Sequence, residues 1–238
     1  MPKLKIGSLA VEVVRKDIKN LHLAVYPPNG RVRVAVPLRV GNEAVRLAVA
    51  SRLGWIRRQQ KRLAAQARQS AREFVSRESH YFLGRRYLLN VIIHDGPGRV
   101  VINGKPAIDF YVPGGVRRST CEKILREWYR RELKALIPPL IAKWEAIMGV
   151  NVADWGVKRM RTKWGTCNPS ARRIWINLEL AKKPVQCLEY IVVHEMVHLL
   201  ERKHNERFIA HMDKLLPQWR SLRNQLNSFP LRHEKWEY

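Results

Sequence analysis

The stretch His194-Glu195-Met196-Val197-His198 decides how the second half of this chain is interpreted. Two histidines four positions apart on a helix are separated by about 40° around its axis, so both imidazoles leave one face and can hold one ion. Glu195 lies at the flank of that face, where its carboxylate can reach a metal-bound water. The pattern H-E-x-x-H is typical of a zinc site with a glutamate general base. The stretch therefore predicts a zinc-dependent hydrolase.

A third ligand is expected, because catalytic zinc sites commonly use three protein ligands and keep a position for water. We favour His204, six residues after His198, because neutral imidazole is a common zinc ligand. Glu201 is the alternative, since it lies near the same helix face. Glu201 also stands where the metzincin pattern H-E-x-x-H-x-x-G-x-x-H has glycine, so the tight turn of that pattern is not supported. Asn205 is expected to cap the helix that follows.

The expected chemistry is hydrolysis by a water that the ion acidifies to a pKa of about 7. Glu195 would take up the proton and pass it to the leaving group. The motif does not fix a donor for the developing oxyanion. Arg161, Lys163 and Tyr190 are the candidates for contacts with the substrate or the oxyanion, and a structural role is the alternative for each.

The charge of the chain favours anionic partners. Its 238 residues include 45 Lys and Arg against 20 Asp and Glu, a formal net charge of +25. Such an excess suits nucleic acid, nucleotides, acidic proteins or anionic lipid. The residues of a candidate anion-binding helix face are Arg57, Arg58, Lys61 and Arg62. A face of this kind can also simply be solvated.

Other features bear on the location of the protein. No apolar run approaches the roughly 18 residues of a membrane span, and the first residues show no secretory h-region. The cysteines Cys121, Cys167 and Cys187 are odd in number and far apart, so no disulfide framework is indicated. We expect a cytoplasmic protein with no membrane contact. The sequence does not fix an oligomeric state.

Hydrophobic periodicity predicts an α+β fold in two parts, with a boundary at Pro113-Gly114-Gly115. We expect residues 1–115 to be a β-rich region with a long basic helix from Asn42 to about Phe74. Its strands are expected at 11–14, in hairpins over 21–36 and 100–112, and in a pair over 81–94. The second hairpin is expected to have Asn103-Gly104 at its turn. We expect residues 116–238 to hold a helix over 119–148 bent or broken at Pro138-Pro139, an extended stretch at 151–161, a loop at 162–169, a strand at 173–178 and the motif helix to about Leu200. No internal repeat is visible in the sequence.

Several segments carry a family resemblance. They are Lys163-Trp164-Gly165-Thr166-Cys167, Ile176-Asn177-Leu178, Tyr190 to His198, His204-Asn205-Glu206-Arg207-Phe208, Leu215-Leu216-Pro217 and, upstream, Tyr81-Phe82-Leu83-Gly84-Arg85-Arg86-Tyr87. This set resembles the YgjP-like metallopeptidase family, which is related to SprT-like zinc proteases. The departures from the family pattern are Thr166 for serine, Met196 for leucine and Asn205 for serine.

The resemblance implies a zincin-like catalytic domain of the minimal gluzincin type over residues 116–238. It also implies Zn²⁺ as cofactor, with Glu195 as base and, as ligands, His194, His198 and His204. A family resemblance says less about the substrate, because the peptidase activity follows largely from the motif.

Three functions remain open at this point. The first is a zinc metallopeptidase acting on a peptide or protein, including one bound to nucleic acid. Its substrate would pair with an exposed strand, for which residues 173–178 are the candidate. The second is a zinc-dependent hydrolase of a nucleotide or other phosphorylated substrate, and the third is a nucleic-acid-associated module whose metal site is secondary. We favour the first.

Overall fold

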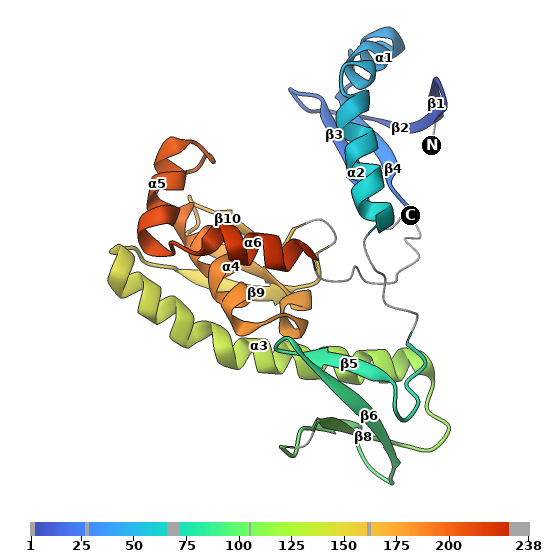
Figure 1. The fold of residues 1–238 in the computed structure, drawn as a ribbon, viewed down its shortest axis with the longest axis vertical. Coiled ribbons are helices and arrows are strands. Elements are labelled where there is room, and N and C mark those ends of the chain that lie inside the picture. Colours follow the sequence, from blue (N-terminus) through green and yellow to red (C-terminus); the bar gives the residue numbers. More distant parts are fainter. Residues whose placement is uncertain (1–2, 27–28, 66–71, 105, 161–162, 229–238) are drawn as a thin grey trace. The chain divides into compact units, whose positions relative to one another are not determined.

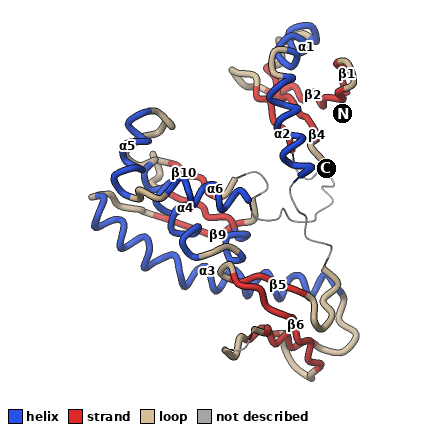
Figure 2. Tube along the Cα trace, in the orientation of Figure 1, coloured by secondary structure: helices blue, strands red, loops and turns tan. Residues whose placement is uncertain are grey.

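The computed structural model describes residues 3–26, 29–65, 72–104, 106–160 and 163–228 (Figure 1). These residues form two compact units, which we call unit 1 (residues 3–65) and unit 2 (Arg72–Ser228). The strands between residues 79 and 112 belong to unit 2. The compact units therefore divide earlier in the chain than Pro113-Gly114-Gly115, and a domain boundary at that point stays a prediction. The mixture of sheets and helices confirms the α+β class (Figure 2).

Unit 1 is a four-stranded sheet with helices packed on one face. Its elements are β1 (Lys3–Ile6), β2 (Leu9–Lys16), β3 (His22–Tyr26), β4 (Arg31–Pro37), α1 (Asn42–Ala50) and α2 (Leu53–Ala65), and its strand order is β1-β2-β4-β3. The alternating valines of β2 and β4, such as Val13 and Val34, point to one face and are buried with Val45, Val49 and Ile56. The predicted hairpin of β3 and β4 is confirmed, and β1 was not predicted.

The prediction of one long helix from Asn42 to Phe74 is wrong in its extent. The helix is interrupted after Ala50, where the Arg52 N–H donates to Val49 O at 3.0 Å in a tighter, three-residue turn. The Ser51 hydroxyl donates to Ala48 O at 3.1 Å and satisfies a carbonyl at the break. Residues 66–71 lie outside the described part of the chain, and Phe74 has a φ of 60°, which no α-helix contains.

Unit 2 begins with a second four-stranded sheet. Its strands are β5 (Ser79–Phe82), β6 (Arg85–Ile93), β7 (Arg99–Val101) and β8 (Ala107–Val112), in the order β5-β6-β8-β7. The parallel pair of β6 and β8 lies in the centre and an antiparallel strand flanks each side, as β2 and β4 are flanked in unit 1. The two sheets thus share one topology, although the sequence showed no repeat.

The helix α3 (Arg118–Met148) runs without interruption through Pro138 and Pro139. The expected break is absent because this side of the helix faces solvent. Pro138 and Pro139 have no N–H to donate to the carbonyls of Lys134 and Ala135. All four residues are exposed, so these two carbonyls can bind water instead. The opposite face of α3 packs on β5. There the Tyr129 hydroxyl donates to Tyr81 O at 2.8 Å.

A three-stranded sheet, a 3₁₀ helix and three α-helices complete the described part of unit 2. The elements are β9 (Asp154–Lys158), β10 (Gly165–Asn168), β11 (Arg173–Asn177), the 3₁₀ helix η1 (Leu178–Lys182), α4 (Val185–Val197), α5 (Glu206–Leu215) and α6 (Trp219–Ser228). The strand order is β10-β11-β9. Part of the expected loop at 162–169 is therefore strand β10, which pairs with β11.

The position of β11 contradicts the prediction that a peptide substrate pairs with residues 173–178. β11 is the middle strand, because β10 pairs antiparallel on one side and β9 pairs parallel on the other. Residues 173–178 therefore offer no free edge to a peptide. Within the described residues, the free edge on this side of the sheet belongs to β10.

Among the residues that the structure describes, no helix combines the length and apolar character that a membrane crossing requires.

Candidate metal centre

The motif helix α4 is a core element of unit 2. Nine of its thirteen residues are buried, because it contacts α3, α5, α6 and the three-stranded sheet. Glu189 fixes it to α3 by accepting hydrogen bonds from Trp144 Nε1 at 3.0 Å and Lys143 Nζ at 2.7 Å. The helix ends at Val197, earlier than the expected Leu200, so its last turn carries the motif. These contacts position the side chains of the motif.

Three histidines converge at the end of α4. One ring nitrogen from each of His194, His198 and His204 lies within 4.8 Å of the other two. His204 reaches the cluster because the chain turns back after α4. Asn205 then begins α5, and its side chain accepts a hydrogen bond from the Phe208 N–H at 3.0 Å. The expected cap at Asn205 is confirmed.

Glu201, the alternative third ligand, is not part of this cluster. Its carboxylate accepts a hydrogen bond from the Lys203 N–H at 3.1 Å and so stabilises the turn. Its backbone oxygen lies 3.1 Å from His198 Nδ1. A donor on Nδ1 leaves Nε2 of His198 as the nitrogen available to an ion, which is the usual arrangement of metal-binding histidines.

The cluster fits a zinc ion by its donor chemistry. His194 Nε2 and His204 Nε2 lie 3.0 Å apart, close to the roughly 3.3 Å between two nitrogens at about 2.0 Å from a tetrahedral ion. Burial lowers the pKa of His194 to about 3, and burial also lowers the pKa of His198. Both rings are therefore neutral at pH 7, the form that binds metals.

Phe208 closes the cluster on one side, and sequence reasoning missed it. Its ring centroid lies 5.0, 4.8 and 4.7 Å from those of His194, His198 and His204. A buried apolar ring there limits water around the histidines and restricts their rotation. The signal in the sequence was the capping position of Asn205, three residues earlier, which points Phe208 inward at the start of α5.

Glu195 is buried between α4 and β10, with only 5% of its surface exposed. Burial raises the pKa of its carboxyl to about 8, and the charge of Lys163 acts in the opposite direction. Gly165 of β10 makes room for it: a Cβ at that position would lie 2.5 Å from Glu195 Oε1 and 2.6 Å from its Cγ. Sequence reasoning missed this contact, although a glycine within a strand often marks close approach.

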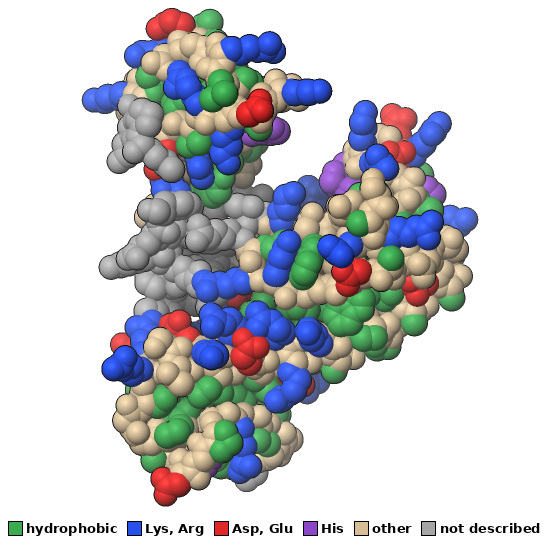
Figure 3. Space-filling view, turned by 180° about the vertical axis from the view of Figure 1, so that it is seen from behind, with side chains coloured by type: hydrophobic (Ala, Val, Ile, Leu, Met, Phe, Trp, Pro, Cys, Tyr) green, Lys and Arg blue, Asp and Glu red, His purple; other side chains and the backbone are tan. Residues whose placement is uncertain are grey.

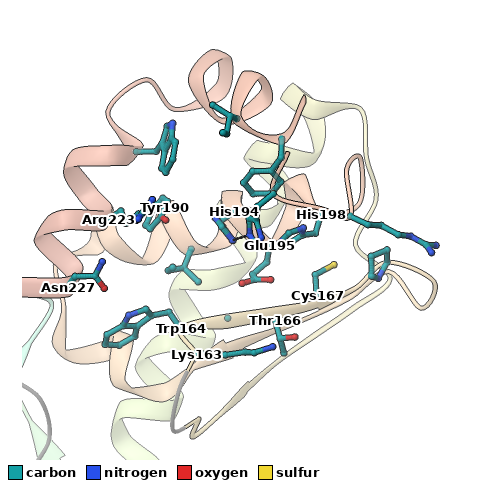
Figure 4. Close-up of a pocket in the computed structure, with 18 of the residues that line it drawn as sticks. Lys163, Trp164, Thr166, Cys167, Tyr190, His194, Glu195, His198, Arg223 and Asn227 are labelled. Carbon is teal, nitrogen blue, oxygen red and sulfur yellow. Dashed lines mark hydrogen bonds between the residues drawn. The ribbon is translucent and has the colours of Figure 1, made fainter. Parts of the chain in front are cut away.

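A cleft of about 810 Å³ opens in front of these groups (Figure 4). Its lining includes Glu195, the three histidines, β10 and residues of α5 and α6. Tyr190 lies one turn before His194 and beside Arg223, while Lys163 lies near the start of β10, below Glu195 in the figure. Burial raises the pKa of Tyr190, so its hydroxyl stays protonated.

The remaining candidates lie elsewhere or are not described. Arg161 lies outside the described residues. Arg57, Arg58 and Lys61 are exposed on α2 of unit 1, and Arg62 belongs to the same helix, but the structure does not describe its side chain. Cys167 lines the cleft from β10 without joining the histidine cluster, and burial raises the pKa of its thiol to about 11.

Paired histidines and a buried glutamate on one helix, with a third histidine beyond it, are the arrangement found in metallopeptidases. Comparison with known families supports this class. The family model "YgjP-like, metallopeptidase domain" matches residues 19–229, so the chain belongs to the YgjP-like metallopeptidase family, as its sequence indicated.

The crystal structure of the metallopeptidase zymogen of Pyrococcus abyssi abylysin is similar over 37% of this chain and 89% of that chain, at 15% identity and a TM-score of 0.35. A likeness this low carries no argument about fold or function. No functionally curated protein matches.

Proposed function

We propose that this protein is a zinc-dependent metallopeptidase in which Glu195 is the general base and the metal ligands are His194, His198 and His204. One observation carries the proposal: three imidazoles converge within 4.8 Å in the same cleft as the buried carboxylate of Glu195. Membership of a metallopeptidase family supports the peptidase class. The three-imidazole donor set is one that zinc prefers and that leaves a position for water.

Glu195 supplies the proton transfers of the reaction. Zinc held by the histidines would contribute Lewis acidity, which acidifies a water and polarises the carbonyl of the scissile bond. Glu195 takes the proton of the attacking water and gives it to the amine nitrogen as the C–N bond breaks. Its high pKa of about 8 suits a group that must hold a proton between these steps, while a cation at the histidines favours the ionised form that starts the cycle.

We propose that a peptide substrate pairs with the free edge of β10. β10 carries Gly165 against Glu195, and its outer edge pairs with no other strand among the described residues. An extended substrate can add to such an edge through backbone hydrogen bonds, which positions successive peptide groups along the cleft. We propose Lys163 and Tyr190 as contacts for the substrate or oxyanion, because both line the cleft and both are hydrogen-bond donors. Arg161 stays a prediction.

A second candidate function is hydrolysis of a nucleotide or another phosphorylated substrate. The observation that favours it is the excess of basic residues in the cleft lining. Among the described residues, the lining contains one acidic residue, Glu195, and three Lys or Arg residues, which are Lys163, Arg202 and Arg223. Guanidinium groups suit phosphate oxygens particularly well. The same base and metal would serve attack on phosphorus.

One set of assays separates the two candidates. Zinc-loaded wild type and Glu195→Gln are incubated with reduced, unfolded proteins and, separately, with nucleoside triphosphates. The matched control is Glu206→Gln, which removes an exposed carboxylate at the start of α5. We expect proteolysis by wild type and the control and none by Glu195→Gln. Phosphate release that needs Glu195, without proteolysis, would replace the first candidate with the second. Loss of neither activity in Glu195→Gln would refute both.

A further inference from the structure

Unit 1 carries a charge imbalance that the metal centre does not use. Residues 1–71 include 15 Lys and Arg against three acidic residues, and residues 44–71 include seven Lys and Arg and no acidic residue. Two of the three acids already have partners, since Glu12 lies 3.1 Å from Arg31 and Glu43 lies 3.6 Å from Arg46. Lys and Arg side chains project from several sides of this unit (Figure 3).

The orientation of α2 on the sheet directs part of this charge outward. Ile56 is fully buried, and Gln60 Nε2 donates to Gly30 O at 2.8 Å in the turn before β4. The two residues lie so close together that a Cβ added at Gly30 would be 2.9 Å from Gln60 Cγ. With this side of the helix fixed inward, Arg57, Arg58 and Lys61 are exposed on consecutive turns of the other side. We call these three side chains the α2 basic face.

The exposed side of the helix α3 of unit 2 offers a comparison. Three of the four arginines of α3 lie next to an acidic residue of the same helix: Arg118 with Glu122, Arg130 with Glu127 and Arg131 with Glu132. The α2 basic face has no such neighbours, because the sequence of α2 contains no acidic residue. Like charges at neighbouring helical positions repel each other. An anionic partner removes this cost.

We propose that the α2 basic face binds the phosphate backbone of nucleic acid without reading its sequence. An anionic lipid surface fits less well, since a helix that lies in a membrane interface needs an outward apolar face. On α2 the apolar side chain of Ile56 is buried and faces inward. Among the described residues of α2, Trp55 is the large apolar residue that is exposed. Arginine matches phosphate geometry better than lysine does, and Arg57 and Arg58 supply two of the three charges.

The test uses the full chain and labelled oligonucleotides of about 20 nucleotides, as single-stranded DNA, duplex DNA and single-stranded RNA, titrated over a range of salt. The test variant is R57E/R58E/K61E. The control R117E/K123E/K134E changes the net charge equally at exposed positions at and along α3. Circular dichroism melting checks that both variants remain folded.

We expect the wild type and the control to bind and the test variant to lose affinity by on the order of 100-fold at about 0.1 M salt, with the slope of log K against log salt reduced by about 3. Glu195→Gln should bind as wild type does, which separates this inference from the proposed catalysis. The inference would be overturned if both triple variants lost affinity equally, or if the test variant lost none. It would also be overturned if polyglutamate or phosphatidylserine vesicles competed for the protein as well as the oligonucleotides do.

Discussion

Gly165→Ala is the sharpest test of how the proposed base is positioned. The new Cβ would lie 2.5 Å from Glu195 Oε1, 2.6 Å from Cγ and 2.8 Å from Cδ. Carbon atoms in contact normally lie about 3.5–4.0 Å apart, so the carboxylate and its stem must retreat by about 1 Å. Rotation of the carboxylate alone does not relieve the overlap, because Cγ is also too close.

The expected effect is a loss of activity with the metal retained. A displacement of about 1 Å at a catalytic group costs roughly 100-fold in rate, or about 2.7 kcal/mol of transition-state stabilisation. Overpacking should also lower the free energy of unfolding by about 1–3 kcal/mol. The overlapping atoms belong to Glu195 and not to the three histidines, so zinc content should stay near that of wild type.

Gly156→Ala is the matched control, because it strains the same sheet at β9. A Cβ there would lie 2.4 Å from the Trp175 ring, which holds its three nearest atoms and does not line the cleft. We expect it to lower stability and leave kcat/KM for an unfolded protein substrate nearly unchanged. In a Glu195→Gln background, Gly165→Ala should cost no further activity, since both changes act through one group. Wild-type kcat/KM in zinc-loaded Gly165→Ala would refute this reasoning.

Further predictions concern the metal and the pH. His204→Ala should lose stoichiometric zinc, whereas Glu201→Ala should keep it, as measured by elemental analysis; the reverse result would exchange their roles. Zinc at 100-fold over its Kd should stabilise the wild type by about 2.7 kcal/mol in thermal melts, and a melting temperature that chelation leaves unchanged would contradict a bound ion. Burial lowers the pKa of His80 to about 4. Because the folded state disfavours its protonation, stability should fall by about 3 kcal/mol between pH 6.5 and 4 in urea titrations, and less in His80→Gln. A rise in stability over that window would contradict this prediction.

The sequence was most informative where one local pattern decides one local structure. The Asn-Gly turn at residues 103–104 predicted the hairpin of β7 and β8, and Asn205 predicted the start of α5. The H-E-x-x-H spacing placed His194 and His198 on one helical face, and the structure brings His204 to them. Each of these results depends on residues a few positions apart, whose geometry the helix or the turn dictates.

The features that escaped prediction depend on contacts between distant segments. Gly165 faces Glu195 across 30 positions of sequence, and the place of β11 between β10 and β9 follows from pairing that periodicity does not encode. The end of α1 was missed because residues 51–52 contain no glycine or proline. The helix α3 was expected to be bent or broken at Pro138-Pro139, because the pattern did not reveal that both prolines face solvent.

The shared strand order of the two four-stranded sheets bears on the evolutionary origin of the chain. In each case four strands with the same connections are followed by a helix, a pattern that duplication of an ancestral gene segment would produce. Two copies then drift under different constraints. The copy in unit 2 cannot change its helix freely, because α3 packs against α4. Within unit 1, the helices contribute Val45, Val49 and Ile56 to a separate hydrophobic core, so their exposed positions could change while that core was kept.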